Sequence, residues 1–221
     1  FPVYQGDIGL AMIHAQWMRR MGARHEHRAL ICHDPSCPAI LLNQFEQELR
    51  HTFPNVGSFV YSRPAIPEYP AVANFAFQSV ALRMAQQPCP WMFFEADTVA
   101  LQPNWIEVLQ AEYDACGRSW MGPHVQGMSH ANGVMIYPAD AATRMPNAMN
   151  CGMQAFDMAA AADIMGDCHD CNHLLFHTWS ILNGQWCPVG GGVVPANITL
   201  ELAHQIPKTA MAIHRIKDTS L

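Results

Sequence analysis

Short apolar runs alternate along the chain with longer segments whose apolar residues recur at helical spacing. The runs Ala29–Cys32, Phe59–Tyr61 and Trp91–Phe94 are bounded by polar or turn-forming residues, which is typical of buried strands. Helices are predicted between and beside them, from an Asp7 cap to a Gly22 stop and over 39–51, 71–86 and 105–113. Strands that alternate with helices of this length form βαβ units. The pattern therefore predicts an α/β fold with a mostly parallel central sheet and helices on both faces.

The second half of the chain has a less regular pattern. Strands are predicted at 120–121, 134–137 and 212–214, and helices at 155–165 and 173–182. A loop rich in glycine and proline covers 183–198. This irregularity leaves room for antiparallel strands beside the parallel ones.

Length and composition limit the classes of protein to consider. The 221 residues correspond to one domain, and the apolar fraction of 50% supplies a packed core. The net charge of −6 excludes a general basic surface for nucleic acid, although it leaves room for a local basic groove. Because no apolar run reaches the roughly 18 residues that cross a bilayer, we expect a cytoplasmic protein with no membrane partner. The eight cysteines are scattered and are expected to be free thiols.

The clearest candidate chemistry follows the strand predicted at 91–94. Glu95 and Asp97 are two residues apart, so on an extended chain their carboxylates project to the same side. In open α/β sheets, ligands bind beyond the carboxyl ends of the strands. One or two carboxylates, completed by substrate phosphates, form the usual Mg²⁺ site. The pair is therefore either a metal site or a pair of turn acids before the helix that begins near Pro103.

Several segments together resemble the GT-A glycosyltransferases, which use nucleotide-sugar donors. Glu95-Ala96-Asp97 resembles their acidic D-x-D motif, with glutamate in place of the first aspartate. Further segments follow in the expected order, namely Asn74 in the preceding helix, Leu-Gln-Pro-Asn-Trp at 101–105, Ala-Asn-Gly-Val-Met-Ile-Tyr at 131–137 and His-Arg-Ile-Lys at 214–217. The acidic motif and the His-x-x-Lys tail are the specific parts of the match.

The resemblance implies a fold, a donor and roles for individual residues. It implies a single Rossmann-like GT-A domain over 1–221, with a nucleotide-binding half at 1–100 and a half for the acceptor and the donor sugar at 101–221. It further implies that His214 is the last protein ligand of a Mn²⁺ or Mg²⁺ ion held with Glu95 and Asp97. A UDP-sugar is the default donor, and the residues expected around it are Asn74, Asn132, Gly133 and Lys217.

The composition of the tail supports its role independently of the resemblance. Lysine occurs only at 208 and 217, so a lysine three residues after His214 points to a specific task. An imidazole nitrogen suits Mn²⁺ better than Mg²⁺, and the Lys217 ammonium is suited to stabilise charge on a departing diphosphate. The competing interpretation of the tail is a frayed, solvated terminus. For Asn132-Gly133 the competing interpretation is a plain β-turn.

Asp157 is the candidate catalytic base. It opens the alanine-rich helix predicted at 155–165, and an inverting transferase needs a base to deprotonate the acceptor hydroxyl. An acid at this position also stabilises the helix dipole without any catalytic role. Asp163 and Asp167 are weaker candidates for the base. A retaining reaction needs no base of this kind.

Two other functions remain open at this point. Cys168, Cys171, His173 and His177 have spacings found in zinc sites, and they suggest a non-catalytic zinc-binding module. The acidic pair also suits a metal-dependent nucleotidyltransferase, which shares the carboxylates but transfers a nucleotidyl group.

The acceptor is suggested by resemblance alone. The compact chain and its Lys-Asp-Thr-Ser-Leu tail look like small transferases of phage type, some of which glucosylate 5-hydroxymethylpyrimidines in DNA. The net charge of −6 counts against DNA, because phosphate contacts supply most DNA affinity. A flipped base can still enter a pocket if the arginines cluster at its mouth.

Overall fold

The amino-terminal part of the molecule is built from parallel βαβ units. The computed structural model describes residues 1–62, 68–125, 127–177 and 206–214. Within it, a parallel sheet has the strand order β1 (Pro2–Val3), β2 (Arg28–His33) and β3 (Asn55–Val60), joined by α1 (Ile8–Arg20) and α2 (Ala39–Leu49). Each helix returns the chain to a neighbouring parallel strand, as the sequence pattern predicts.

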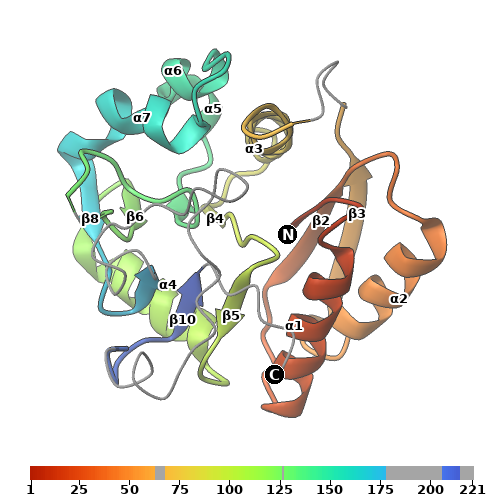
Figure 1. Cartoon of the computed structure of the whole chain (residues 1–221). Helices are drawn as coiled ribbons and strands as arrows, with labels where there is room; N and C mark the ends of the chain where they lie inside the picture. Colours follow the sequence, from red (N-terminus) through yellow and green to blue (C-terminus); the bar gives the residue numbers. More distant parts are fainter. Residues whose placement is uncertain (63–67, 126, 178–205, 215–221) are drawn as a thin grey trace.

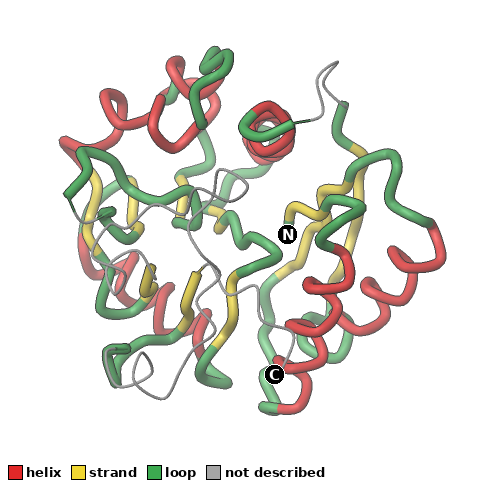
Figure 2. The backbone as a smooth tube through the Cα atoms, in the orientation of Figure 1, coloured by secondary structure: helices red, strands yellow, loops and turns green. Residues whose placement is uncertain are grey.

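Helices cover both faces of this sheet (Figures 1 and 2). Ile31 of β2 packs in the core that also contains residues of α1 and α2, whereas its neighbour Cys32 packs in the core formed with α3 (Ala71–Met84). Successive side chains of a strand point to opposite faces, so each face of β2 has its own apolar partner. The predicted α/β fold with helices on both faces is confirmed.

Two mixed sheets of short strands lie in the rest of the described chain. One has the order β5 (Thr98–Ala100), β10 (Ala212–His214), β9 (Leu175–His177), and the other has the order β4 (Trp91–Met92), β7 (Ile136–Tyr137), β6 (Trp120–Gly122), β8 (Cys168–Asp170). β10 pairs antiparallel with β5 and parallel with β9, and β7 pairs antiparallel with both of its neighbours. The less regular second half thus contains the antiparallel strands for which its sequence left room.

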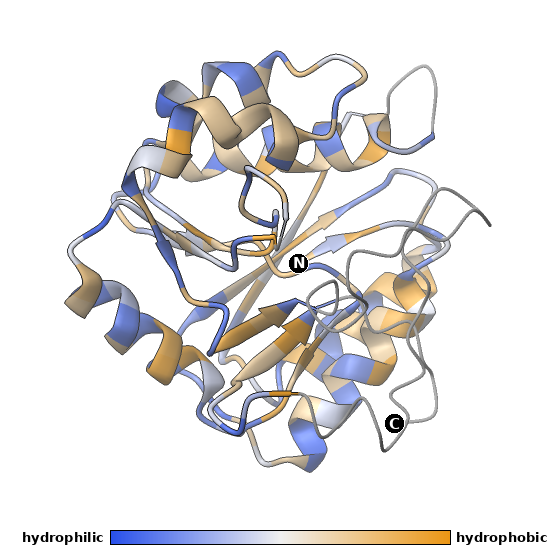
Figure 3. Ribbon diagram, turned by 60° about the vertical axis from the view of Figure 1, so that its left-hand side comes forward, coloured by the Kyte–Doolittle hydropathy of each residue, from blue (hydrophilic) through white to orange (hydrophobic). Residues whose placement is uncertain are grey.

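The remaining described helices accompany these two sheets. They are α4 (Trp105–Cys116), α5 (Ala141–Arg144), α6 (Pro146–Met149) and α7 (Phe156–Ile164), the last followed by a 3-10 turn at Met165–Asp167. Figure 3 shows hydrophilic and hydrophobic residues interleaved along the helices, as expected for helices that bury one side. Among the described residues, no helix is both long and apolar enough to cross a bilayer.

The prediction of a helix over 173–182 is wrong for residues 173–177, which are the ones that the structure describes. The chain turns at 172–174 and continues as β9, while 178–182 and the loop at 183–198 lie outside the described residues. A run such as Leu174 to Phe176 suits a helix and a buried strand equally well in sequence. Pairing decides between them, because Phe176 lies opposite Ile213 in the parallel ladder with β10.

Gly133 is a point of close approach between the loop before β7 and α7. A Cβ atom at this position would lie 2.5 Å from Cζ of Phe156. The Phe156 ring stacks on Phe77 with centroids 4.1 Å apart and meets Phe93 edge-on at 5.7 Å. Because aromatic neighbours fix that ring, packing requires a glycine at 133.

Gly133→Ala is therefore expected to lower the free energy of unfolding by about 1–3 kcal/mol, since the new methyl group displaces the Phe156 ring. Gly9→Ala is the matched control, because Gly9 lies inside α1 and a Cβ there meets no neighbouring atom within 4 Å. Urea unfolding of both variants and the parent checks the expectation. Equal midpoints for Gly133→Ala and the parent would contradict it.

Candidate functional site

Two carboxylates lie in the turn that joins β4 to β5. The chain leaves the β4 sheet after Met92, and the Thr98 N–H donates to the Glu95 carbonyl (3.0 Å), which closes the turn. Glu95 and Asp97 are therefore presented by a tight turn rather than by the extended strand expected from the sequence. Both carboxylates nevertheless contact the same partner, a histidine.

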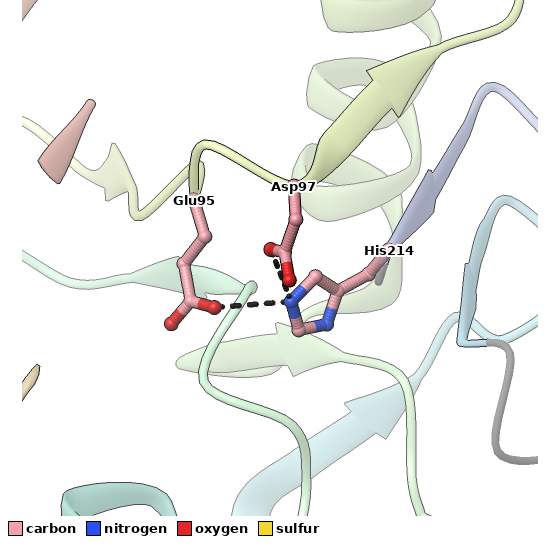
Figure 4. A group of neighbouring side chains, drawn as sticks. All are labelled: Glu95, Asp97 and His214. Atoms are coloured by element: carbon pink, nitrogen blue, oxygen red, sulfur yellow. Dashed lines mark hydrogen bonds and ion pairs between the residues drawn. The ribbon is translucent and has the colours of Figure 1, made fainter. Parts of the chain in front are cut away.

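That partner is His214, which is 119 residues beyond Glu95 in the chain. Its Nε2 lies 3.0 Å from Oε2 of Glu95 and 3.1 Å from Oδ1 of Asp97 (Figure 4). The antiparallel ladder produces this meeting, since it places His214 opposite Thr98, the residue that follows Asp97. The structure thus brings together the three residues that the sequence analysis expected to share a cation.

Electrostatics at His214 are dominated by the two carboxylates. Burial of the ring, which is 2% exposed, lowers the pKa of His214, but Asp97 and then Glu95 outweigh this effect and raise the pKa to about 9. Near neutral pH the His214 ring is therefore protonated, and its positive charge offsets the charge of one of the two carboxylates. A divalent cation satisfies the same carboxylates if that proton leaves.

The three side chains fit a divalent metal ion in kind and in spacing. Glu95, Asp97 and His214 each offer one ligand atom, and these atoms all lie within 4.8 Å of one another. Two carboxylate oxygens and one imidazole nitrogen form a donor set suited to Mn²⁺ or Mg²⁺, with further positions left for substrate oxygens. Among the described residues, no other group of three such side chains is gathered this closely.

Two buried histidines that the sequence analysis did not assign to this site lie next to it. His177 of β9 sits opposite His214 in the parallel ladder, with ring centroids 5.1 Å apart. His14 of α1 lines a small cavity together with Glu95, and burial lowers the pKa of its ring despite the opposing charge of Asp97. The only signal for His14 is that it interrupts an apolar helix stripe, which does not reveal what it contacts.

The side chain of Asn74, on α3, forms hydrogen bonds with the backbone segment that leads into α7. Its Nδ2 donates to the carbonyls of Gly152 (3.2 Å) and Gln154 (2.8 Å), and its Oδ1 accepts from the Phe156 N–H (2.9 Å). The side chain is 2% exposed. Its expected contact with the nucleotide stays a prediction, while the structure shows that it fixes the entry to α7.

Asn74→Ala is expected to lower the free energy of unfolding by about 2–4 kcal/mol, because two carbonyls and one N–H lose a buried partner. Asn43→Ala is the control, since Asn43 is exposed on α2. Thermal unfolding followed by circular dichroism compares them. If both variants unfold at the same temperature as the parent protein, the hydrogen bonds of the Asn74 side chain do not contribute to stability.

Asn132 and Gly133 form a turn, but not the type favoured by Asn-Gly in hairpins. Oδ1 of Asn132 accepts from the Val134 N–H (2.8 Å), and Gly133 lacks the positive φ that such hairpin turns need. The Gly133 carbonyl accepts from the Tyr137 hydroxyl (2.7 Å). The turn is thereby tied to β7, and a contact of Asn132 with the donor sugar stays a prediction.

Asp157 lies in the first turn of α7, as expected for an acid that stabilises a helix dipole. Its Oδ1 accepts from the Met158 N–H (2.9 Å). Burial raises the pKa of the Tyr137 hydroxyl well above its ordinary value, and the charges of Asp157 and Glu95 both add to this rise. Asp157 and Glu95 thus act on one buried hydroxyl, while the role of Asp157 as a base stays a prediction.

The zinc interpretation of 168–177 finds no support in the described structure. Cys168 lies in β8 and His177 in β9, with a turn between them, and no group of three candidate ligands forms from this segment. His169 instead pairs with Glu112 of α4 at 2.7 Å. Lys217, expected at the diphosphate, lies outside the described residues.

A further group of polar side chains lies at the carboxyl ends of the three parallel strands. Tyr4 follows β1, Asp34 follows β2 and Tyr61 follows β3. The Tyr61 hydroxyl donates to Oδ2 of Asp34 (3.1 Å), and the Tyr4 and Tyr61 rings meet edge to face with centroids 6.4 Å apart. Burial raises the pKa of Tyr4, and the charge of Glu95 adds to the rise. This edge of the sheet therefore adjoins the acidic turn.

Comparison with known proteins identifies the fold. No protein-family model and no curated protein matches the chain. The galactosyltransferase LgtC in complex with donor and acceptor sugar analogues has a TM-score of 0.60 and 10% identity, with 97% of this chain and 85% of that chain covered. An active-site mutant of LgtC gives 0.63 and 9%, with 100% and 90% covered. The apo form of mouse xyloside xylosyltransferase 1 gives 0.58 and 10%, with 100% and 97% covered. The chain has the GT-A fold of these glycosyltransferases.

Proposed function

We propose that this protein is a metal-dependent glycosyltransferase that moves a sugar from a nucleotide-sugar donor to an acceptor hydroxyl. The observation that carries the proposal is the meeting of Glu95, Asp97 and His214 at 3.0–3.1 Å, at the sheet edge where open α/β folds bind ligands. The fold, shared with a galactosyltransferase and a xylosyltransferase, agrees with this reaction class.

The nucleotide is proposed to occupy the edge formed by Tyr4, Asp34 and Tyr61. Tyr4 is the partly exposed ring of this edge and can stack on a base, while Asp34 and Tyr61 are buried and hold each other in place behind it. This edge adjoins Glu95, so a diphosphate that continues from the nucleoside reaches the acidic turn. Uridine is the default base by resemblance.

The three ligands are proposed to hold Mn²⁺ or Mg²⁺ against that diphosphate. When bound, the ion supplies positive charge that stabilises the nucleoside diphosphate as it leaves. His214 contributes its Nε2 after losing a proton, while Lys217 is proposed to contact the diphosphate from the tail. Asn132 is proposed to orient the donor sugar, and Asp157 to accept the proton of the acceptor hydroxyl if the reaction inverts configuration.

The proposal is tested by incubating the protein with Mn²⁺ and a panel of nucleotide sugars and nucleoside triphosphates, and by measuring the nucleoside diphosphate and the pyrophosphate released. We expect nucleoside diphosphate to be released from at least one donor, with UDP-glucose first in the panel, and the release to stop in EDTA. Release of pyrophosphate from a nucleoside triphosphate in place of nucleoside diphosphate would identify a nucleotidyltransferase. No metal-dependent release of either kind would refute both.

A further inference from the structure

A groove of about 640 Å³ lies along α6 and α7, outside the site described above. Its polar lining comes from one hydroxyl and three carboxamides, those of Ser129, Asn147, Asn150 and Gln154. The rest of its lining consists of the sulfur-containing side chains of Cys151 and Met158 and of three alanines of α7. No acidic or basic side chain lines it. Figure 1 shows α5, α6 and α7 grouped together on the opposite side of the molecule from α1 and α2.

The walls of this groove are held in place by the protein's own hydrogen bonds. Nδ2 of Asn147 donates to Oδ1 of Asp163 (2.7 Å), and Nδ2 of Asn150 donates to the Pro146 carbonyl (3.0 Å). The Gln154 carbonyl accepts from the buried Asn74. Two of the three carboxamide side chains and the backbone at Gln154 are thus already ordered, which lowers the entropy cost of binding a ligand there.

Both walls of the groove continue directly into the segments proposed for the reaction. Ser129 belongs to a loop that the Val125 N–H closes on the His130 carbonyl (3.0 Å), and Asn132 follows this loop. Met158 is the residue after Asp157, and its side chain is 48% exposed. The groove therefore borders the loop that leads to Asn132 and the helix whose first turn contains Asp157.

The chemistry of the lining selects for an uncharged ligand rich in hydroxyl groups. Carboxamides and a hydroxyl both donate and accept hydrogen bonds, and the methyl and thioether groups suit the C–H faces of sugar rings. Nucleic acid requires lysine or arginine against its phosphates, and none lines the groove.

We infer that this groove binds neutral sugar residues of a carbohydrate acceptor, beyond the sugar whose hydroxyl reacts. The assignment to an acceptor rests on the proposed function, whereas carbohydrate binding in the groove does not require it. An uncharged lining of this kind favours a neutral glycan over hydroxymethylated DNA as the acceptor.

The test combines a binding measurement with a transfer measurement. Fluorescently labelled protein is applied to an array of neutral and anionic glycans and to duplex DNA that contains 5-hydroxymethylcytosine. The groove is filled by Ala162→Trp, at an exposed position of α7, and Ala111→Trp at an exposed position of α4 is the matched control. Any neutral glycan that binds is then supplied with UDP-glucose and Mn²⁺, and the ratio of glycan transfer to donor hydrolysis is measured.

We expect neutral glycans to bind the parent protein and Ala111→Trp, and Ala162→Trp to weaken this binding more than tenfold and to reduce the transfer ratio by a similar factor. Binding only to anionic glycans or to DNA, no binding at all, or equal binding by both tryptophan variants would overturn the inference. Its failure is distinct from that of the proposed function, because metal-dependent donor hydrolysis requires no glycan. If neutral glycans bind and Ala162→Trp alone weakens this binding, but no donor is hydrolysed, carbohydrate binding in the groove is confirmed and the transferase proposal fails.

Discussion

Asp97→Asn is expected to reduce metal-dependent release of nucleoside diphosphate by at least roughly a hundredfold. The carboxamide keeps the size of the side chain but removes the negative charge that lies 3.1 Å from Nε2 of His214. A neutral oxygen attracts a divalent cation less strongly, so the cation dissociates more readily and less charge opposes the departing diphosphate. Initial rates over a range of Mn²⁺ concentrations measure the effect.

The control for this experiment is Asp114→Asn, because Asp114 is an exposed acid on α4. Its rate is expected to match that of the parent protein. Circular dichroism spectra of both variants show whether the fold is retained. If folded Asp97→Asn releases nucleotide at the parent rate and with the same Mn²⁺ dependence, Asp97 is not a metal ligand.

Metal binding is expected to strengthen about tenfold for each pH unit from pH 7 to pH 8.5, and to level off above pH 9. The pKa of His214 is raised to about 9, so below that pH the cation must displace one proton from Nε2. The dissociation constant for Mn²⁺ therefore falls as the pH rises. Electron paramagnetic resonance of free Mn²⁺ gives the constant, and calorimetry in two buffers gives the number of protons released.

The raised pKa of His214 also affects folding stability. The metal-free protein, kept in EDTA, is expected to become less stable as the pH rises, whereas metal binding becomes stronger. A histidine whose pKa is higher in the folded state stabilises that state fully below its unfolded pKa of about 6.5, and this contribution is lost as the pH rises through about 9. His214→Gln removes both pH dependences, whereas His51→Gln, at an exposed position, leaves them intact. Equal Mn²⁺ affinity at pH 7 and pH 8 would show that His214 is not protonated when the cation arrives.

The sequence indicates the acidic pair as candidate chemistry because the two acids directly follow a strongly apolar strand. Trp91–Phe94 and Ala212–Ile213 are readable as buried segments, and polar residues directly after them must emerge at sheet edges. The choice of His214 as the third ligand came from the resemblance of the tail. The register that places His214 opposite Thr98 is a long-range property that no local pattern contains.

The site residues and the strand that the sequence did not reveal are also determined by contacts between segments far apart in the chain. Sequence spacing groups His177 with the neighbouring cysteines, whereas the ladder of β9 with β10 places it beside His214. Tyr4 and Tyr61 are single polar aromatics after short strands, and only their meeting shows that they form one edge. The helix expected at 173–182 failed because periodicity in a short apolar run does not separate helix from buried strand.

The position of β10 between β5 and β9 has a consequence for the order in which the protein matures. During synthesis, the acidic turn leaves the ribosome more than a hundred residues before the histidine that completes it, since Glu95 and His214 are 119 residues apart. Until β10 inserts, the inward edges of β5 and β9 have no strand to bond to, and the cation has only two of its three ligands. If the three side chains hold a cation as proposed, its site is completed only when β10 inserts, so metal binding would report on the insertion of β10.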